Sequence, residues 1–597
     1  GTMWTADIEC NGLNPTKIHV LSCMKVGSDK IFSTDNYDKM RKFFLNEQHT
    51  IVMHNGIRFD APVIEKILDI KIKAKIICSL SLSWYLNHDR KKHGLGEYGE
   101  EYGVPKPKIE DWENQTYEDY KHRCEEDVKI NAKLWEELWG KLLKLYGTET
   151  EAHKLIDYLS FKMKCAQMQE ESRWKLDVVR AEKGLATLTK EKEEKTAVLA
   201  SVMPEVPVVV KKTRPKKPFK QDGTESSAGL KWFSILTQKN LPREFDGEVE
   251  VVTGHKPPNP GSVPQIKDWL YSLGWKPETF KFQRNKKTGD VKQIPQINSD
   301  KEDGVCTSVK KLYKKCADLE VLDGLSVLTH RISILKGFLK AVDDEGYIKA
   351  EIQGFTNTLR VKHAVCVNLP GVKSPYGELI RGCLTAPEGF ELCGSDMSSL
   401  EDRIKQHWMW KFDPNYVREM MTPDFDPHLD LAVVAGALTK EQVAAHKSGV
   451  EDHSGIRSNY KTANYACQYG AGGATVARGA GIKKSEGDKL VEAYWKRNWA
   501  VKAVPKTIQV KNEFGCMWLF NPISKFWYSL RTEKDIFSTL TQGSGAYCFD
   551  MWVKHVLSKR PQLTAQFHDE IVLCVKTGHR EKCESLLRWA IQETNKE

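Results

Sequence analysis

The sequence has no hydrophobic run long enough to span a membrane, and no signal-peptide pattern opens it. Its 15 cysteines are scattered, and no two of them form a Cys-x-x-Cys pair. This distribution indicates neither a zinc site nor a disulfide framework, so we expect a protein of a reducing cytoplasm without a membrane partner. A strong charge of one sign is also absent, because Lys and Arg (90) exceed Asp and Glu (80) by only ten. That mild basic bias is compatible with a polyanionic partner but does not require one.

At 597 residues the chain is too long for one core, and several domains are expected.

One hairpin carries the most information about function. Near the end of the chain, apolar β-forming runs at 563–567 and 571–575 enclose a tip of His568, Asp569 and Glu570. Adjacent acids on a rigid turn indicate a metal carboxylate. The alternative is an ordinary turn, since turns are rich in Asp.

A second acid has a similar setting. Residues 391–396 predict a short strand that ends in Asp396, and Ser398 to Glu401 has the spacing of a capping box. We therefore expect Asp396 at a strand end beside a helix N-terminus. In the alternative interpretation Asp396 belongs to a turn and Glu401 is only a cap.

A third segment, 457–470, predicts a helix with a functional face. Arg457, Lys461, Tyr465 and Tyr469 are each four residues apart, which places them on one side of a helix that Gly470 ends. Two cations and two aromatic rings suit a triphosphate with its base or sugar. A solvated, charged helix face is the alternative.

Together the three segments resemble, in order and spacing, the polymerase motifs of the family A DNA polymerases, and most of all the T7-type phage enzymes. Residues 368–378 and 542–546 extend the resemblance. It implies a multidomain α/β protein with a right-hand polymerase of palm, fingers and thumb. It also implies that Asp396 and Asp569 hold two Mg²⁺ ions, which Mn²⁺ can replace, for two-metal phosphoryl transfer.

The same resemblance assigns roles to the other motif residues. Arg457 and Lys461 would neutralise the triphosphate of a dNTP, and Lys461 would also donate a proton to pyrophosphate. The remaining nucleotide-binding positions are Tyr465 at the sugar, Glu401 as a steric gate against ribose, His428 near the β-phosphate and Tyr469 near the templating base. The DNA-binding positions near the primer end are Arg360, Gln542, His568 and Glu570. The sequence departs from the family at Leu359, where glycine is usual and where leucine would add bulk beside the DNA, and at Asp402, where an apolar residue is usual.

The first 150 residues carry a separate set of acids. Asp7 and Glu9 are two apart on the predicted strand 4–10, so they share one face, which is costly unless they face water or bind metal. With Asp60 and Asp127, which is expected to open a helix over 128–142, they resemble the DEDD 3′–5′ exonucleases. The resemblance implies two divalent ions here as well.

The exonuclease resemblance departs at one position. Arg123 stands where proofreading domains usually carry Tyr, four residues before the last acid. His122 has the five-residue spacing of the histidine branch of the superfamily, and we predict it to be the general base or to orient the water.

The middle of the chain predicts long helices and a basic insertion. Six of the ten residues 211–220 are basic, and Pro215 and Pro218 exclude a regular helix there. This stretch is either a flexible loop or a contact to duplex phosphates. The insertion at about 204–258 stands where T7-type enzymes bind a processivity factor, so such a partner is a candidate here. His330, Arg331 and Lys336 are expected on a helix that contacts phosphates.

The predicted organisation is an RNase H-like exonuclease domain at 1–150, a thumb at 151–340 and a palm with fingers at 341–597. The predicted function is DNA-templated extension of a primer with dNTPs plus 3′–5′ proofreading, in phage genome replication in the host cytoplasm, by a monomer bound to primer–template DNA. Three alternatives are a single-subunit RNA polymerase, a non-catalytic DNA-binding protein and a nuclease alone. Glu401 and the His568–Glu570 tip argue against the first, and the intact carboxylates argue against the other two.

Overall fold

The computed structural model describes residues 1–299, 303–366, 368–397, 399–468, 470–480, 482–567 and 569–597. The chain forms two compact units. The first contains Gly1–Lys175, Tyr347–Val367 and Thr385–Glu597, and the second contains Leu176–Gly346 and Asn368–Leu384. The limits of these units differ from those of the three predicted domains: α6 (Glu149–Ser172), for example, lies in the first unit and not with the expected thumb helices. Two units do not correspond one to one with three domains, so the predicted domain boundaries stay predictions.

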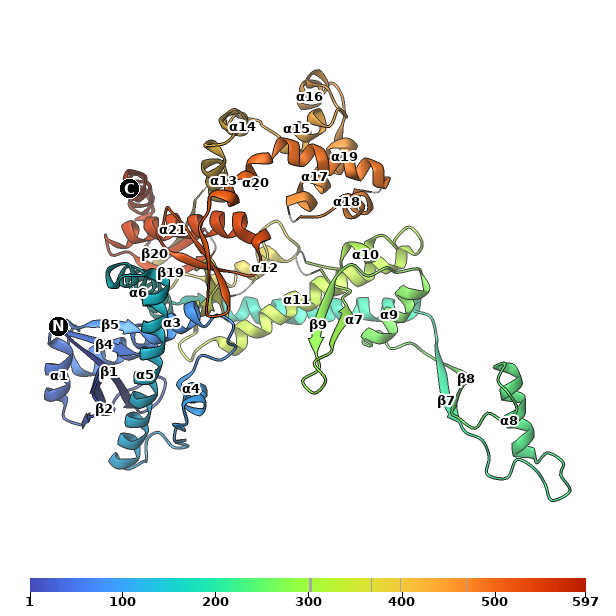
Figure 1. Ribbon diagram of the computed structural model, residues 1–597, viewed down its shortest axis with the longest axis horizontal. Helices are drawn as coiled ribbons and strands as arrows, with labels where there is room; N and C mark the ends of the chain where they lie inside the picture. Colours follow the sequence, from blue (N-terminus) through green and yellow to red (C-terminus); the bar gives the residue numbers. More distant parts are fainter. Residues whose placement is uncertain (300–302, 367, 398, 469, 481, 568) are drawn as a thin grey trace. The chain divides into compact units, whose positions relative to one another are not determined.

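The first unit begins with a five-stranded mixed sheet of order β3-β2-β1-β4-β5, drawn in blue in Figure 1. Its strands are β1 (Thr2–Cys10), β2 (Ile18–Lys25), β3 (Ile31–Thr34), β4 (His49–Met53) and β5 (Lys75–Cys78). β1 is antiparallel to β2 and parallel to β4. Helices α1 (Tyr37–Leu45) and α2 (Ala61–Leu68) bury Phe44 and Ile64 in the core of this sheet.

A long helix, α5 (Tyr117–Tyr146), packs against β1 and β2. Asp127 was expected to open this helix, and that expectation is wrong. The helix begins at Tyr117 because Thr116 and Asp119 form a capping box, in which each side chain accepts the other's backbone N–H. Asp127 is therefore an interior helical residue, and its side chain can face the sheet.

The C-terminal part of the first unit is built on a second sheet of order β15-β20-β19. Its strands are β15 (Phe390–Asp396), β19 (Gln562–Phe567) and β20 (Glu570–Lys576), in the three segments where the sequence predicts strands. Helices α13 (Leu400–Trp410), α21 (Ile536–Leu557) and α22 (Arg580–Lys596) bury their apolar sides in the same core as this sheet.

A third small sheet joins the C-terminal part to the N-terminal part. It consists of β16 (Val510–Glu513), β17 (Cys516–Phe520) and β18 (Trp527–Leu530). Trp518 and Tyr528 from this sheet lie in one hydrophobic cluster with Tyr85 and Trp135 from α3 (Ser79–Leu86) and α5. The Tyr85 hydroxyl donates a hydrogen bond to the Trp527 carbonyl at 2.6 Å. The two ends of the chain therefore share one core.

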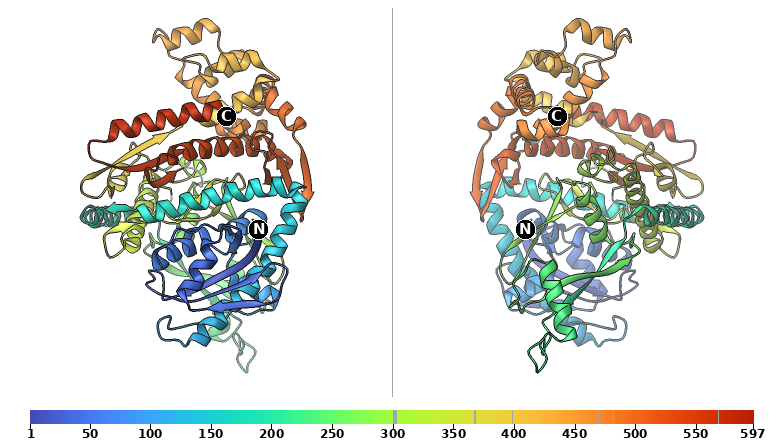
Figure 2. Two further views of the ribbon diagram at one scale, coloured as in Figure 1. Left: turned by 90° about the vertical axis from the view of Figure 1, so that its left-hand side faces the viewer. Right: turned by 90° about the vertical axis from the view of Figure 1, so that its right-hand side faces the viewer.

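Five helices share one hydrophobic core, in gold and orange in Figure 2. They are α15 (Pro427–Val434), α16 (Lys440–Lys447), α17 (Ser454–Gln468), α18 (Gly473–Ala480) and α19 (Lys484–Arg497), whereas α14 (Pro414–Met420) packs in a separate cluster with Met409 of α13. α17 is the helix predicted over 457–470, and Gly470 beyond its end has a φ of 84°, a left-handed conformation that suits glycine.

The second unit consists of two long packed helices with additions. α7 (Val178–Val202) packs on α11 (Glu320–Ala341), and α9 (Val263–Ser272) and α10 (Thr307–Lys310) contribute to the core beside them. β9 (Phe280–Arg284) and β10 (Val291–Pro295) form a hairpin. The predicted insertion is a ribbon of β7 (Val206–Lys212) and β8 (Val249–Lys256) that carries α8 (Ser227–Gln238), shown in green in Figure 1.

The predicted phosphate contact of Arg331 is wrong. Its side chain is completely buried, and it donates hydrogen bonds to the Pro375 carbonyl and to Asp303, both at 2.9 Å. Lys336 on the same helix is exposed. None of the described helices has the length and apolar composition needed to cross a lipid bilayer. All the cysteines are free.

Candidate active sites

Two acids from distant parts of the sequence end on adjacent strands of the C-terminal sheet. β15 and β20 are antiparallel, and their register pairs Asp396 with Glu570. The Met397 N–H donates to the Asp569 carbonyl at 3.0 Å, which continues the pairing beyond the strands. Asp396, Asp569 and Glu570 thus lie at one end of the sheet, on a frame held by backbone hydrogen bonds.

The residues around this end explain why the acids can approach each other. Ile571 and Leu573 of β20 are fully buried in the core beneath the sheet, so they anchor the strand that follows the acids. A Cβ atom at Gly394 would lie 2.9 Å from a carboxylate oxygen of Glu570. Glycine at this position therefore leaves room for the Glu570 side chain across the sheet.

Arg360 is brought to the same place by a tight turn. Its guanidinium Nη2 donates to Asp569 at 3.0 Å, and both side chains are about three-quarters buried. Leu359, which was expected to add bulk beside DNA, is instead 1% exposed and lies in the large hydrophobic cluster, so that expectation is wrong. Its φ of 67° is the left-handed conformation for which glycine is the usual residue.

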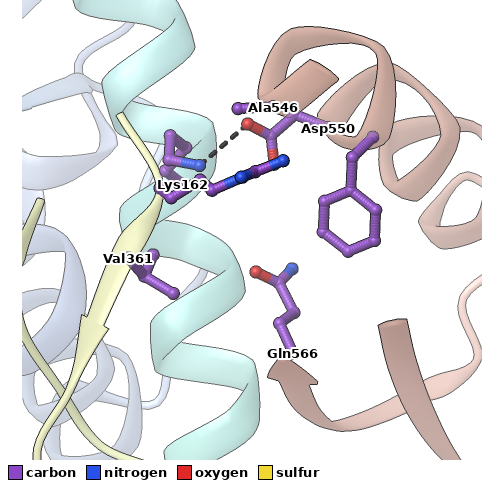
Figure 3. A pocket seen from close by; sticks show the side chains of 7 residues that line it. Lys162, Val361, Ala546, Asp550 and Gln566 are labelled. Carbon is purple, nitrogen blue, oxygen red and sulfur yellow. Dashed lines mark hydrogen bonds and ion pairs between the residues drawn. The ribbon is translucent and has the colours of Figure 1, made fainter. Parts of the chain in front are cut away.

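A small pocket next to Arg360 holds a buried ion pair (Figure 3). Lys162 of α6 donates to Asp550 of α21 at 2.8 Å, and the Tyr158 hydroxyl donates to the same carboxylate. The Lys162 side chain is only 5% exposed, and the Asp550 side chain only 3%. The other residues that line the pocket are Arg360, Val361, Ala546, Phe549 and Gln566. No local pattern in the sequence predicts this pair, because its members are 388 residues apart.

We expect Asp550→Ala to destabilise the protein by about 3–5 kcal/mol, because it leaves the buried Lys162 charge without a partner. The measurement is the denaturant midpoint of the full chain. Asp157→Ala is the matched control, since Asp157 lies on α6 like Lys162 but forms an exposed pair with Lys75 of β5, and its loss should cost less than about 1 kcal/mol. Equal losses in the two variants would contradict the prediction.

The predicted nucleotide helix carries a cluster of polar side chains. Asp426 caps α15 by accepting the N–H groups of His428 and Leu429, and it also accepts from Arg457 at 2.7 Å. The rings of His428 and Tyr465 are 5.9 Å apart, and Tyr465 is 52% exposed. The structure therefore brings together His428, Arg457 and Tyr465, which the sequence named separately.

The charges of this cluster suit an anion. Lys461 is exposed on the same helix, while Ala463 and Cys467 are buried on the other side. Burial lowers the pKa of His428; Asp426 opposes this, and the positive charges of Arg457 and Lys461 lower it further. A bound polyphosphate would relieve the repulsion among these cations.

The remaining predicted positions are placed as follows. Glu401 is exposed in the first turn of α13, and Gln542 is half-buried in α21. Asp402 is exposed as well. Tyr469 and His568, together with Ser398 of the expected capping box, lie outside the described residues.

The N-terminal acids form a second cluster. One ligand atom from each of Asp7, Glu9 and Asp127 lies within 4.8 Å of the others. Asp60 is buried close enough to raise the pKa of Asp7 by its charge. Asp7 and Glu9 come from β1 and Asp127 from α5, so the packing of this helix on the sheet assembles the cluster.

Burial and mutual repulsion disfavour the charged forms of these acids. Burial raises the pKa of Asp7 well above its usual range, and the charges of Asp127, Glu9 and Asp60 raise it further. Burial, with Asp127, also raises the pKa of Glu9 to about 8 and that of Asp60 to about 8. A bound cation would offset the repulsion among these carboxylates and so favour their charged forms.

The donor set fits divalent cations. Asp60 Oδ2 and Asp127 Oδ1 are buried and have no hydrogen-bond partner among the described residues. Two cations only partly offset the negative charge: Lys106 lies 3.4 Å from Asp127, and Arg123 lies 3.5 Å from Glu9. Lys106 had no recognisable signal in the sequence.

Arg123 and His122 have different positions on α5. Arg123 contacts Glu9, donates to the Pro107 carbonyl and lies over the Trp112 ring at 4.6 Å. His122 is exposed and is not brought to the cluster. His122, five positions before Asp127, points about 140° away from it around the helix axis. Arg123, four positions before Asp127, lies on nearly the same side of the helix. The structure therefore corrects the assignment of His122 as a general base.

The chain is similar to known proteins over much of its length. A family model described as DNA polymerase family A matches residues 243–597. The DNA-directed DNA polymerase of Enterobacteria phage T3 is 24% identical over 382 residues, which are 56% of this chain and 50% of that protein. The enzyme of Escherichia phage T7 is 24% identical over 376 residues, 55% of this chain and 49% of that protein. The chain thus spans about half the length of these curated relatives.

The fold is similar to that of a solved polymerase domain. The POL domain of Pol1 from M. smegmatis, in a complex with DNA primer-template and dNTP, superposes with a TM-score of 0.65 at 14% identity. The superposition covers 99% of this chain and 92% of the other. The mixed α/β multidomain arrangement is therefore that of a polymerase fold.

Proposed function

The chain belongs to DNA polymerase family A, and from this we propose that it extends a DNA primer on a DNA template with dNTPs. The observation that carries the proposal is the position of Asp396, at the end of β15, beside Asp569, in the turn before β20, where the Met397 N–H donates to the Asp569 carbonyl. Carboxylates in this arrangement can hold two divalent ions, and DNA polymerases generally use such ions. We propose Mg²⁺, two per site, with Mn²⁺ as a substitute. Bound there, the ions would lower the pKa of the primer 3′-OH and stabilise the charge that develops on the α-phosphate.

The chain's own groups would bind and orient the substrates. Arg457 and Lys461 would neutralise the triphosphate, and Lys461 would donate a proton to the leaving pyrophosphate. His428, held by the hydrogen bond between its Nδ1 and Asn464 at 2.9 Å, would contact the phosphates. The exposed Tyr465 ring would lie against the sugar.

Arg360 and Gln542 would act at the primer end. Donors in the minor groove meet acceptors that all correct base pairs share, so they test pair shape rather than sequence. In the free protein Arg360 is paired with Asp569. We propose that cations at Asp569 release Arg360 toward the primer, and that Glu570 supports the same end of the sheet. Tyr469 and His568 remain proposals from the family pattern alone.

A second activity, 3′–5′ hydrolysis of DNA, is supported by the N-terminal acid cluster. Asp7, Glu9, Asp60 and Asp127 would hold two divalent ions that activate water and stabilise the leaving 3′ oxygen. Arg123, 3.5 Å from Glu9, stands beside the cluster where it could contact the scissile phosphate.

We propose that the protein replicates a phage genome in the host cytoplasm as a monomer bound to primer–template DNA. A processivity factor at 204–258 also stays a proposal. The test is extension of a labelled primer with Mg²⁺ and dNTPs, rNTPs or no nucleotide. Extension with dNTPs and shortening without nucleotide support both activities. Shortening alone would leave only a nuclease, and extension with rNTPs in preference would indicate an RNA polymerase.

We expect Glu401→Ala to raise the incorporation of ribonucleotides relative to deoxynucleotides about 10- to 100-fold. The exposed Glu401 side chain would crowd a ribose 2′-OH, and a steric contact of this size discriminates by about 1–3 kcal/mol. The measurement is the ratio of kcat/KM for the two nucleotides. Asp402→Ala removes the neighbouring exposed acid and should leave the ratio unchanged. An unchanged ratio in Glu401→Ala would refute the gate.

A further inference from the structure

Three side chains with different donor atoms meet on the first unit, and none of them belongs to either active site. His88 and Asp89 follow α3, and Cys516 is the first residue of β17. The Cys516 Sγ atom is 3.7 Å from His88 Nε2 and 3.6 Å from Asp89 Oδ2. His88 Nε2 is 3.5 Å from Asp89 Oδ1. One donor atom from each residue lies within 4.8 Å of the other two.

These separations match the edges of a metal tetrahedron. Zinc binds thiolate sulfur at about 2.3 Å and imidazole nitrogen or carboxylate oxygen at about 2.0–2.2 Å. At tetrahedral angles, such bonds hold neighbouring donor atoms about 3.3–3.7 Å apart. The two Asp89 distances are to different carboxylate oxygens, and rotation of this exposed side chain would bring one oxygen to both partners.

Rigid neighbours hold two of the three donors. Cys516 pairs with Glu513 of β16, and the next residue, Met517, pairs with β18, so the start of β17 is held in the sheet. The His88 ring stands edge-on to the fully buried Trp518 ring, at 5.6 Å and 86°. His88 Nδ1 is buried without a hydrogen bond in the described part of the chain, which leaves Nε2 as the nitrogen that faces Cys516.

We propose that Cys516, His88 and Asp89 bind one Zn²⁺ ion. Thiolate and imidazole ligands favour a borderline-soft ion over Mg²⁺ or Ca²⁺. The thiolate and the carboxylate together balance the two charges of the ion. Asp89 is 82% exposed, so the ion can enter from solvent, and a water would complete the fourth position.

The ion would tie the N-terminal part of the first unit to its C-terminal part. Asp89 and Cys516 are 427 residues apart in sequence, and the ion would link the segment after α3 to β17. The absence of a Cys-x-x-Cys pair is thus compatible with a zinc site whose ligands come from distant segments. The expected consequence is a higher unfolding temperature in Zn²⁺ than in chelator.

Cobalt is a suitable probe, because a thiolate bound to Co²⁺ gives a charge-transfer band in the near ultraviolet that carboxylate sites cannot give. The full chain, reduced and freed of metal, should develop this band with one equivalent of Co²⁺ and lose it when Zn²⁺ is added. Cys516→Ser should abolish the band, and His88→Gln should weaken Co²⁺ binding at least tenfold. Cys548→Ser, at a partly exposed cysteine outside the cluster, should behave like the unchanged protein.

Two results would overturn the proposal: no band in the unchanged protein, or a band that persists in Cys516→Ser. Unfolding temperatures in chelator show whether the variants still fold. If Cys516→Ser does not fold, His88→Gln decides, because it keeps the thiol and removes only the nitrogen ligand. Undiminished Co²⁺ binding in that variant would exclude the three-residue site.

Discussion

Asp569→Asn should reduce primer extension by at least about 10³-fold, which corresponds to about 4 kcal/mol of lost transition-state stabilisation. Asparagine has nearly the same shape as aspartate, so the strands on either side of the turn can keep their pairing. It cannot supply the negative charge that holds a divalent ion against the developing charge on the α-phosphate. The measurement is single-turnover extension by one nucleotide with saturating Mg²⁺ and dNTP.

Two controls separate this effect from damage to the fold. Asp402→Asn removes an exposed acid near the same sheet and should leave extension within about twofold. The Asp569→Asn protein should still shorten a primer in the absence of nucleotides, because the N-terminal acids are intact. Extension within tenfold of the unchanged protein would mean that Asp569 does not hold a catalytic ion.

Asp7→Asn should abolish shortening of the primer, again by about 10³-fold or more, and leave extension intact. The pKa of Asp7 is raised by burial and by the charges of Asp127, Glu9 and Asp60, so its carboxyl group interacts with all three other members of the cluster. Without its charge the remaining acids bind cations more weakly. Release of labelled nucleotide from a single-stranded primer measures the effect, and Asp29→Asn, at an exposed loop acid, is the control.

Stability measurements give a second readout of the same cluster. The folded pKa values of Glu9 and Asp60 are about 8, against ordinary values of 4.5 and 3.8. At pH values between the ordinary and the folded pKa, the unfolded chain has released protons that the folded chain keeps. The metal-free protein should therefore lose stability as the pH rises toward 8. Asp7→Asn removes one buried acid whose own pKa is raised, and should therefore make this loss smaller in chelator. A steeper loss would contradict the assembled cluster, and unchanged shortening of the primer would contradict its catalytic role.

The elements that the sequence predicted best are those that local patterns define. Apolar β-forming runs predicted β19 and β20, the short segment ending in Asp396 predicted β15, and four-residue spacing predicted α17. Errors came where a local pattern was overridden. The start of α5 was placed too late because the capping box at Thr116 and Asp119 was not recognised. The charge of Arg331 predicts a phosphate contact, but its burial is decided by tertiary packing, which the sequence does not report.

The sequence by itself determined which residue types end the strands and occupy one side of α17, and hence the family to which the chain belongs. Only the tertiary structure decided which distant residues meet: Arg360 with Asp569, Lys162 with Asp550, and Cys516 with His88. The physical reason is that periodicity reports which side of an element is buried and says nothing of what covers it. Contacts between residues hundreds of positions apart depend on how all the elements pack, and the packing of α5 on β1 in the same way decided that Arg123, and not His122, lies beside the N-terminal acids.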